Sequence, residues 1–266
     1  MSFCQVNTIR MHYRVVGNGT PLLLIMGLSA DLTWWERLVP ELEGQFQVVT
    51  FDNRGAGLTG KSDERYSIPM FAEDAVGLLN ALNIPRAHVF GVSMGGMIAQ
   101  ELVLRNPDRV DRLALGCTHS GGPGFIAPSV EAIQNLTLTR GKSLEEFARQ
   151  IVSILFSPHF QKADPEYVKT MIQRYVSNPP SGKAFTNQFW AVLGHNCYDR
   201  LPAIDTPTLI LTGDADVLIP PENSRVLNER IRGSRTVTIP TAGHAFFIEA
   251  PRETARYLIS HFSGAG

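Results

Sequence analysis

Residues 89–99 read Val-Phe-Gly-Val-Ser-Met-Gly-Gly-Met-Ile-Ala, a strand-like run joined to a helix-like run through one serine. This is the Gly-x-Ser-x-Gly pattern of a nucleophile elbow, in which the serine stands on a tight turn between a strand and a helix. Gly91 and Gly95 lack the Cβ atoms that would collide across such a turn. The pattern predicts a strained, accessible Ser93. The N–H of Met94, at the start of the helix, becomes a candidate donor to an oxyanion.

The same stretch also fits a glycine-rich turn whose serine only caps the helix. A base and an acid elsewhere in the chain favour the nucleophile. Asp216 lies in a loop after an apolar run, and His244 lies in the loop after the last predicted strand. These positions predict Ser93 as nucleophile, His244 as general base and Asp216 as the acid that orients it. Asp214 remains the alternative acid, although it could instead fix the turn.

Strand-like and helix-like runs alternate from about residue 20 to residue 117, which is typical of a parallel sheet with helical crossovers. Half-buried strands are expected over 6–16. Predicted buried strands lie at 21–26, 46–51, 88–91, 112–117, 208–212 and 235–239, and predicted helices at 67–82, 94–105 and 251–262. Only helical patterns occur between Gly121 and Ile204, at 129–138, 143–156, 165–176 and 184–193.

The predicted fold is therefore α/β, with a mostly parallel twisted sheet flanked by helices and an all-helical cap inserted before the last strands. Residues 1–120 and 205–266 would form the core domain, and residues 121–204 the cap or lid. We expect the cap to cover the carboxyl edge of the sheet, where ligands bind in open α/β sheets.

Composition restricts the class of partner. The 266-residue chain is 44% hydrophobic and carries 24 Lys and Arg residues against 25 Asp and Glu residues, with no basic run. We therefore expect a small-molecule substrate, no nucleic acid and no membrane, and homo-oligomers are left open. The first 16 residues lack an apolar stretch of the length found in signal peptides, which predicts a cytoplasmic protein. Cys4, Cys117 and Cys197 are expected to be free thiols, with Cys117 in the core.

These motifs resemble those of the α/β-hydrolase fold superfamily over nearly the full chain. The similarity is to the branch that holds small carboxylesterases, cofactor-free haloperoxidases and 3-oxoadipate enol-lactonase-like enzymes. It is carried by residues 52–57, 91–96, 213–216 and 243–244. The resemblance implies that Asp216 is the acid, that the backbone of Leu28 is the second oxyanion donor, that residues 121–204 are the cap, and that no cofactor is used.

One departure from the family pattern lies in the loop after the first core strand. Most relatives have His-Gly there, whereas this chain has Met26-Gly27. Because the implied donor is a backbone N–H, the chemistry survives the change. A serine at position 93 argues against haloalkane dehalogenases and epoxide hydrolases, whose nucleophile in this fold is an aspartate.

Other residues have a structural and a functional interpretation. Gly27, Trp34, Trp190 and Phe246 are predicted to line an apolar substrate pocket, with Trp35, Phe125, Phe189 and Phe247 as further candidates. Arg54 either binds a substrate carboxylate or braces its loop. Among the histidines, His88 is expected to be structural, and His12 and His261 to be exposed. His119 either faces the pocket or has no special role, and His195 is expected to cap or pack. No metal-ligand spacing is present.

The sequence thus predicts a serine hydrolase that cleaves a small carboxylic ester or lactone through an acyl-enzyme. A cofactor-free haloperoxidase or perhydrolase would use the same triad. Cleavage of a carbon–carbon bond has no specific residue in its favour. A small-molecule receptor on a hydrolase fold is the alternative from another class.

Overall fold

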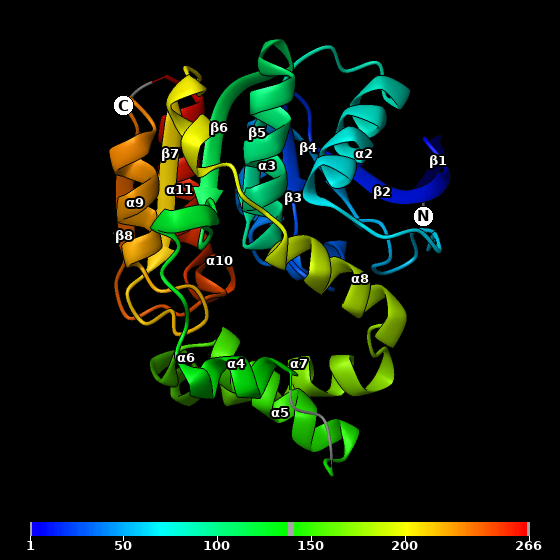
Figure 1. The fold of residues 1–266 in the computed structure, drawn as a ribbon, viewed down its shortest axis with the longest axis vertical. Coiled ribbons are helices and arrows are strands. Elements are labelled where there is room, and N and C mark those ends of the chain that lie inside the picture. The colour runs from blue at the N-terminus through cyan, green and yellow to red at the C-terminus, as the bar shows by residue number, and fades with distance from the viewer. Residues whose placement is uncertain (1, 138–140, 265–266) are drawn as a thin grey trace.

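An eight-stranded sheet forms the centre of the protein in the computed structural model, which describes residues 2–137 and 141–264 (Figure 1). Its strand order is β1-β2-β4-β3-β5-β6-β7-β8, with β1, β2 and β4 paired antiparallel and all later pairs parallel. The strands are β1 (Ser2–Val6), β2 (Ile9–Val16), β3 (Thr20–Ile25), β4 (Phe46–Phe51), β5 (Ala87–Val92), β6 (Val110–Gly116), β7 (Thr208–Gly213) and β8 (Arg235–Ile239). The predicted α/β class with a mostly parallel sheet is confirmed.

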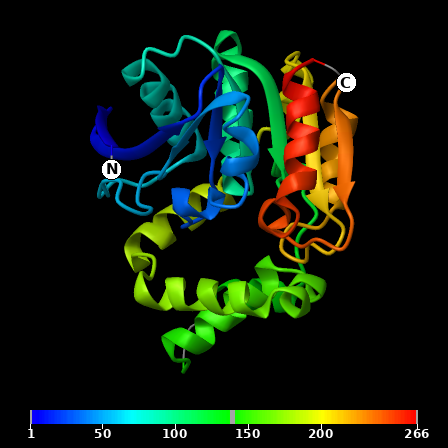
Figure 2. The ribbon, with the colours of Figure 1, turned by 180° about the vertical axis from the view of Figure 1, so that it is seen from behind.

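Helices cover both faces of this sheet because its central strands are apolar on both sides. Successive side chains of a strand point to opposite faces, so Leu23 and Ile25 pack into one core while Leu22 and Leu24 pack into the other. Helices α2 (Ile68–Ala81), α3 (Met94–Arg105) and α9 (Glu222–Arg230) cover the first face. Helices α1 (Val39–Leu42) and α11 (Pro251–Phe262) cover the second, which Figure 2 shows from behind.

Most of the chain between β6 and β7, residues 121–204, is called the helical insertion below. Its described α-helices lie beyond the carboxyl ends of the strands (Figure 1). They are α4 (Val130–Thr137), α5 (Leu144–Leu155), α6 (Pro158–Ala163), α7 (Pro165–Ser177) and α8 (Gly182–Leu193), with short 3₁₀ turns at η3 (Gly122–Gly124) and η4 (Tyr198–Ala203). The predicted helix over 129–138 ends at a position outside the described residues. The division into a core domain and a cap domain stays a prediction.

Helix α6 corrects the predicted set of four helices in this segment. It is only six residues long, so its sequence has too few turns to show a helical period. Its start is nonetheless well defined, because the side chain of Ser157 accepts a hydrogen bond from the N–H of Phe160 and Pro158 occupies the first turn. Helix α9 and the short α10 (Phe246–Glu249) were also not predicted.

Side chains fix the helical insertion at several points to the rest of the described chain, residues 2–120 and 205–264, which is called the sheet domain below. Buried Gln188 of α8 donates to the carbonyl of Arg54 and accepts from the N–H of Ser29, both at 2.7 Å. Ion pairs join Arg37 to Asp164 at 2.6 Å and Glu36 to Arg174 at 2.8 Å. Lys183 also contacts Asp63.

Two histidines that were expected to be exposed are buried. His12 lies beside the end of β4, where its Nδ1 is 2.8 Å from a carboxylate oxygen of Asp52. His261 faces inward from α11, with Nε2 3.0 Å from the carbonyl oxygen of Leu113. Both predictions were wrong because each imidazole has a hydrogen-bond partner in a distant part of the chain, which offsets the cost of burying the ring. Sequence periodicity does not reveal such a partner.

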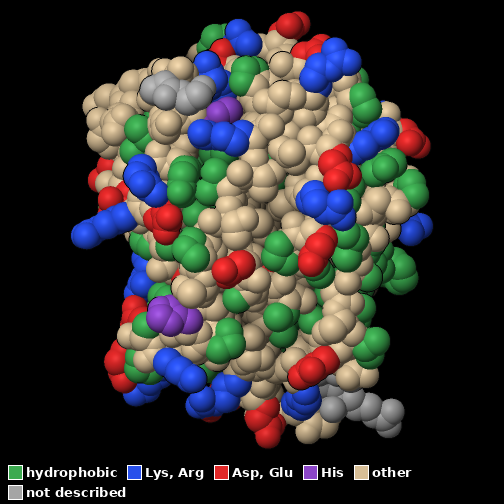
Figure 3. Space-filling view, turned by 90° about the vertical axis from the view of Figure 1, so that its left-hand side faces the viewer, with side chains coloured by type: hydrophobic (Ala, Val, Ile, Leu, Met, Phe, Trp, Pro, Cys, Tyr) green, Lys and Arg blue, Asp and Glu red, His purple; other side chains and the backbone are tan. Residues whose placement is uncertain are grey.

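The outer surface carries charges of both signs. On the face shown in Figure 3, basic and acidic side chains are interspersed and hydrophobic side chains are scattered, which agrees with the formal net charge of −1. Among residues 2–137 and 141–264, no helix has both the length and the apolar composition needed to span a lipid bilayer.

Candidate active site

Ser93 occupies a strained turn between β5 and α3. Its φ of 56° and ψ of −123° lie in a region that non-glycine residues rarely adopt. The Ser93 N–H donates to the carbonyl of Gly116 at 2.9 Å, and the carbonyl of Ser93 accepts from the hydroxyl of Thr118 at 2.7 Å. The Ser93 side chain makes no capping hydrogen bond to α3. The interpretation that this serine only caps a helix therefore does not fit.

The flanking glycines are required by close approach of backbone. A Cβ added to Gly91 would lie 2.1 Å from the carbonyl oxygen of Gly95, and one added to Gly95 would lie 2.0 Å from that of Ile25. Such distances are impossible for real atoms, so no side chain is tolerated without moving the backbone. The turn at Ser93 is thus packed directly against the end of β3.

The predicted base and acid contact one another. Nδ1 of His244 is 2.8 Å from Oδ2 of Asp216, and both side chains are buried. The other oxygen of Asp216 accepts hydrogen bonds from the N–H groups of Leu218 at 2.9 Å and Ile219 at 2.8 Å. Asp214, the competing carboxylate, is exposed. The geometry thus places Asp216, and not Asp214, beside the imidazole.

The charge of Asp216 decides the proton affinity of His244. Burial alone would lower the pKa of His244, but the bonded carboxylate of Asp216 raises it well above the ordinary histidine value. The hydrogen bond from Nδ1 to Asp216 also fixes the tautomer, so that in the neutral ring Nε2 carries the lone pair. His244 is then able to accept a proton at Nε2.

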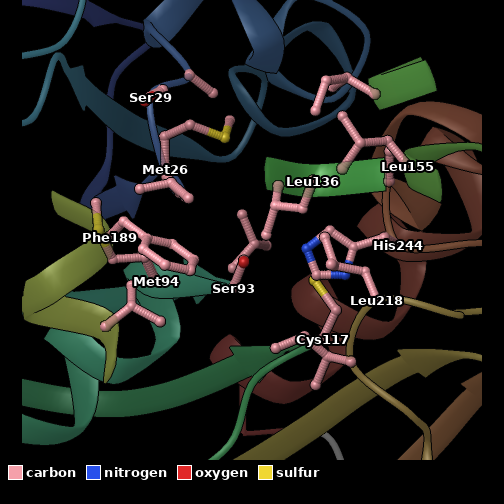
Figure 4. A pocket seen from close by; sticks show the side chains of 18 of the residues that line it. Met26, Ser29, Ser93, Met94, Cys117, Leu136, Leu155, Phe189, Leu218 and His244 are labelled. Atoms are coloured by element: carbon pink, nitrogen blue, oxygen red, sulfur yellow. The ribbon is translucent and has the colours of Figure 1, made fainter. Parts of the chain in front are cut away.

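Cys117 is a neighbour of this pair that the sequence did not reveal. The residue follows the end of β6 with a φ of 39°, and its Sγ, a nitrogen of His244 and an oxygen of Asp216 all lie within 4.8 Å of one another. The Cys117 thiol also interacts with the backbone of Ser93, and burial raises its pKa. Figure 4 shows Ser93, Cys117 and His244 facing one cavity. Cys117 is buried as expected, but it lies beside the candidate site.

The ligand atoms of these three groups also lie close enough together to hold a metal ion. Among the described residues, Cys117, Asp216 and His244 are the group whose ligand atoms lie close enough to hold an ion. Every described hydrogen bond of the Asp216 carboxylate is used for a backbone N–H or for His244. An ion bound by Asp216 would therefore compete with these hydrogen bonds.

The two candidate oxyanion donors lie on the same cavity as Ser93. Leu28 and Met94 both line it, and among the described residues the N–H groups of neither residue form a hydrogen bond. Gly27 lies against the nucleophile, because a Cβ there would be 3.0 Å from Cβ of Ser93. The loop with the unusual Met26 is held by Asn53, whose amide donates to the Met26 carbonyl at 2.8 Å.

The cavity beneath the helical insertion has a volume of about 360 Å³ and a mainly apolar lining. Of the predicted pocket residues, Gly27 and Trp34 line it, as do the further candidates Phe125, Phe189 and Phe247. Trp35, Trp190 and Phe246 do not line it, and Trp35 is fully buried in the core. Trp190 follows Phe189 on α8 and so points away from the cavity, with 52% of its surface exposed. Phe246 is fully buried in the core behind Phe247.

Three further polar side chains resolve alternatives left open by the sequence. Arg54 is buried and forms a bidentate ion pair with Asp74, with both N···O distances at 2.8 Å, so it braces its loop and does not line the cavity. His119 and His195 are buried and do line the cavity. Neither had a signal in the sequence beyond its position at a border of the helical insertion.

Comparison with known proteins agrees with this geometry. A family model described as alpha/beta hydrolase fold matches residues 20–251. Among curated proteins, the provisionally named carbamate hydrolase RutD of Azorhizobium caulinodans is 28% identical over 251 residues, which cover 94% of each chain.

Solved structures give the same result. An enol-lactonase from Burkholderia xenovorans LB400 superposes with a TM-score of 0.85 at 26% identity, over 98% of this chain and 100% of the other. A thermophilic esterase from Thermogutta terrifontis also has a TM-score of 0.85 at 26% identity, over 99% of both chains.

Proposed function

We propose that this chain, which belongs to the alpha/beta hydrolase fold family, is a serine hydrolase. Its proposed substrate is a small carboxylic ester or lactone. The observation that carries the proposal is the His244–Asp216 hydrogen bond on the cavity that Ser93 also lines. A strained serine that does not cap its helix supports a role as nucleophile.

The proposed reaction has two halves. Nε2 of His244 takes the proton of Ser93 as Oγ attacks the substrate carbonyl, and the N–H groups of Leu28 and Met94 stabilise the oxyanion. As the intermediate collapses, His244 gives the proton to the leaving oxygen, and an acyl-serine remains. Water then loses a proton to His244 and attacks the acyl group, which releases the acid and returns the proton to Ser93. Asp216 stabilises the imidazolium throughout without accepting the proton.

The preference for an ester or lactone rests on the cavity and the relatives. A cavity of about 360 Å³ with a mainly apolar lining suits a small, uncharged substrate. The enol-lactonase and the esterase match nearly this whole chain. The similarity to RutD makes a carbamate the competing linkage, since its carbonyl would meet the same nucleophile. Equal-length ester and carbamate substrates, compared by kcat/KM, distinguish the two.

Replacement of the nucleophile tests the proposal. We expect Ser93→Ala to lower kcat for p-nitrophenyl acetate by about 10⁴-fold or more, as in other triads. Ser153→Ala, which removes an exposed hydroxyl from α5, serves as the matched control and should keep the wild-type rate. Hydrolysis by Ser93→Ala at the wild-type rate would refute the proposal.

A further inference from the structure

The two ends of the helical insertion run side by side at the cavity wall, where residues 120–121 pair with residues 196–197. Gly121 and Asn196 form an antiparallel bridge, and the N–H of Cys197 donates to the carbonyl of Ser120 at 2.9 Å. The backbones approach so closely that a Cβ at Gly121 would lie 1.9 Å from the carbonyl oxygen of His195. This pairing brings His119 and His195 together, with ring centroids 6.4 Å apart, and both line the cavity.

The hydrogen bonds of His119 determine which of its nitrogens carries the proton. The N–H of Gly121 donates to Nδ1 of His119 at 3.0 Å, so Nδ1 must carry the lone pair. In the neutral ring the proton is then on Nε2. The ring is held in place by Phe125, whose centroid is 4.2 Å away. His119 therefore presents a hydrogen-bond donor at Nε2.

A longer chain of bonds determines the proton position in His195. The amide nitrogen of Gln100 donates to the carbonyls of Gly96 at 3.0 Å and His119 at 3.2 Å, which fixes the orientation of the amide. Its oxygen accepts from the Cys197 thiol at 3.2 Å, so the single thiol proton is used there. The Cys197 sulfur is then the acceptor for Nε2–H of His195, at 3.5 Å. Nδ1 of His195 is left with a lone pair.

The side chains of His119, His195 and Cys197 are all uncharged near neutral pH. Burial lowers the pKa of His119 to about 3 and the pKa of His195 to about 4. Glu101, which opposes the shift of His195, is itself paired with Arg200. Burial raises the pKa of the Cys197 thiol to about 12. The cavity wall thus offers one neutral donor and one neutral acceptor.

Both atoms are open to a ligand. Within residues 2–137 and 141–264, neither Nε2 of His119 nor Nδ1 of His195 forms a hydrogen bond. Neither nitrogen is among the fully buried side-chain atoms that lack a hydrogen-bond partner, so both are accessible. We propose that His119 and His195 together bind a hydroxyl group of the substrate, which accepts from Nε2 of His119 and donates to Nδ1 of His195. The inference rests on the proposed function and narrows its substrate class to hydroxyl-bearing esters or lactones.

Other polar groups fit this pair less well. A carboxylate or a ketone accepts from His119 but places an oxygen lone pair against that of His195. An ammonium group donates to His195 but places its hydrogen atoms against the N–H of His119. A hydroxyl both accepts and donates at one atom and therefore satisfies the two nitrogens at once.

A substrate panel tests the inference. Methyl butanoate is compared with methyl 2-, 3- and 4-hydroxybutanoate, which place a hydroxyl on the acyl side. Propyl butanoate is compared with the monobutanoate of ethylene glycol, which places a hydroxyl on the alcohol side. We expect the wild type to favour one hydroxy ester over its unsubstituted partner by roughly tenfold or more in kcat/KM, because a site built to hydrogen-bond a group rejects the analogue that lacks it. In His119→Phe and His195→Phe that ratio should fall by roughly tenfold.

The controls separate this inference from the proposed function. His88→Phe is the matched control, since His88 lies in β5 against Phe262 and outside the cavity lining, and it should keep the wild-type ratio. Ester cleavage that depends on Ser93 but shows no hydroxyl preference would overturn the inference and leave the proposed function standing. If both cavity variants fail to fold, the wild-type panel alone decides. A preference that persists in both folded variants would also overturn the inference.

Discussion

The carboxyl edge of the sheet and the helical insertion above it are constrained in different ways. At the sheet edge, backbone atoms determine the geometry, since Gly91 and Gly95 have no room for a side chain. In the insertion, a Cβ on Gly182 would meet nothing within 4 Å, and several contacts to the sheet domain run through side chains such as Gln188. Backbone bonds, such as the one from the Ala245 N–H to the Leu155 carbonyl, add to them. We therefore expect the chemistry to depend on a sheet edge fixed by backbone, and substrate choice to depend on side chains at the border of the insertion.

The largest expected effect comes from a change at the sheet edge, in the carboxylate of Asp216 beside His244. Asp216→Asn keeps the shape of the side chain but favours the wrong tautomer of His244, so kcat should fall by about 10⁴-fold. Asp214→Asn, at the exposed carboxylate two residues earlier, should change kcat by less than about twofold. A reversed order of the two effects in ester hydrolysis would assign the acid to Asp214.

Matched glycine substitutions contrast the two regions directly. Gly95→Ala forces a Cβ to within 2.0 Å of the Ile25 carbonyl oxygen and should lower the free energy of unfolding by roughly 3 kcal/mol or more. Gly182→Ala, at the start of α8, should raise it by about 0.5 kcal/mol, because it restricts the unfolded chain without a clash. Urea denaturation measures both. Equal destabilisation by the two variants would remove the distinction between the regions.

One buried amide, that of Gln188, contributes to the attachment of the insertion to the sheet domain. Gln188→Ala leaves the Ser29 N–H and the Arg54 carbonyl without partners and should cost about 2 kcal/mol in unfolding free energy. Thr186→Ala, on the exposed side of the same helix, should cost less than about 0.5 kcal/mol. If thermal or urea unfolding does not distinguish the two variants, Gln188 does not hold the regions together.

The pH dependence of activity near neutral pH should reflect the ionisation of His244 at the sheet edge, and not that of His119 or His195. In the proposed mechanism neutral His244 is the base, so kcat/KM should fall about tenfold for each pH unit below its pKa, which Asp216 raises well above 6.5. The pKa values of His119 and His195, about 3 and about 4, lie too low to contribute near neutral pH. An acid limb centred near pH 4 would mean that His244 does not act as the base.

The same difference explains what the sequence could predict. Buried strands such as residues 21–26, the turn at Ser93 and the loop position of His244 each follow from a few adjacent residues, and the predicted fold agrees with the structure. Cys117 beside His244 was missed because its partners lie in the loops that follow two other strands. The contact of His119 with His195 depends on a backbone pairing across the whole insertion. Trp190 was wrongly predicted to line the cavity. Consecutive residues of a helix point in different directions, so Phe189 faces the cavity and Trp190 is exposed.

The central claim is that Ser93 forms a covalent acyl-enzyme at the sheet edge. Incubation with a fluorophosphonate, followed by peptide mapping in a mass spectrometer, tests it most directly. The account predicts one adduct per chain, on the peptide that contains Ser93, and none in Ser93→Ala. An unmodified Ser93 in wild-type protein that still hydrolyses esters, or equal labelling of Ser93→Ala, would contradict it.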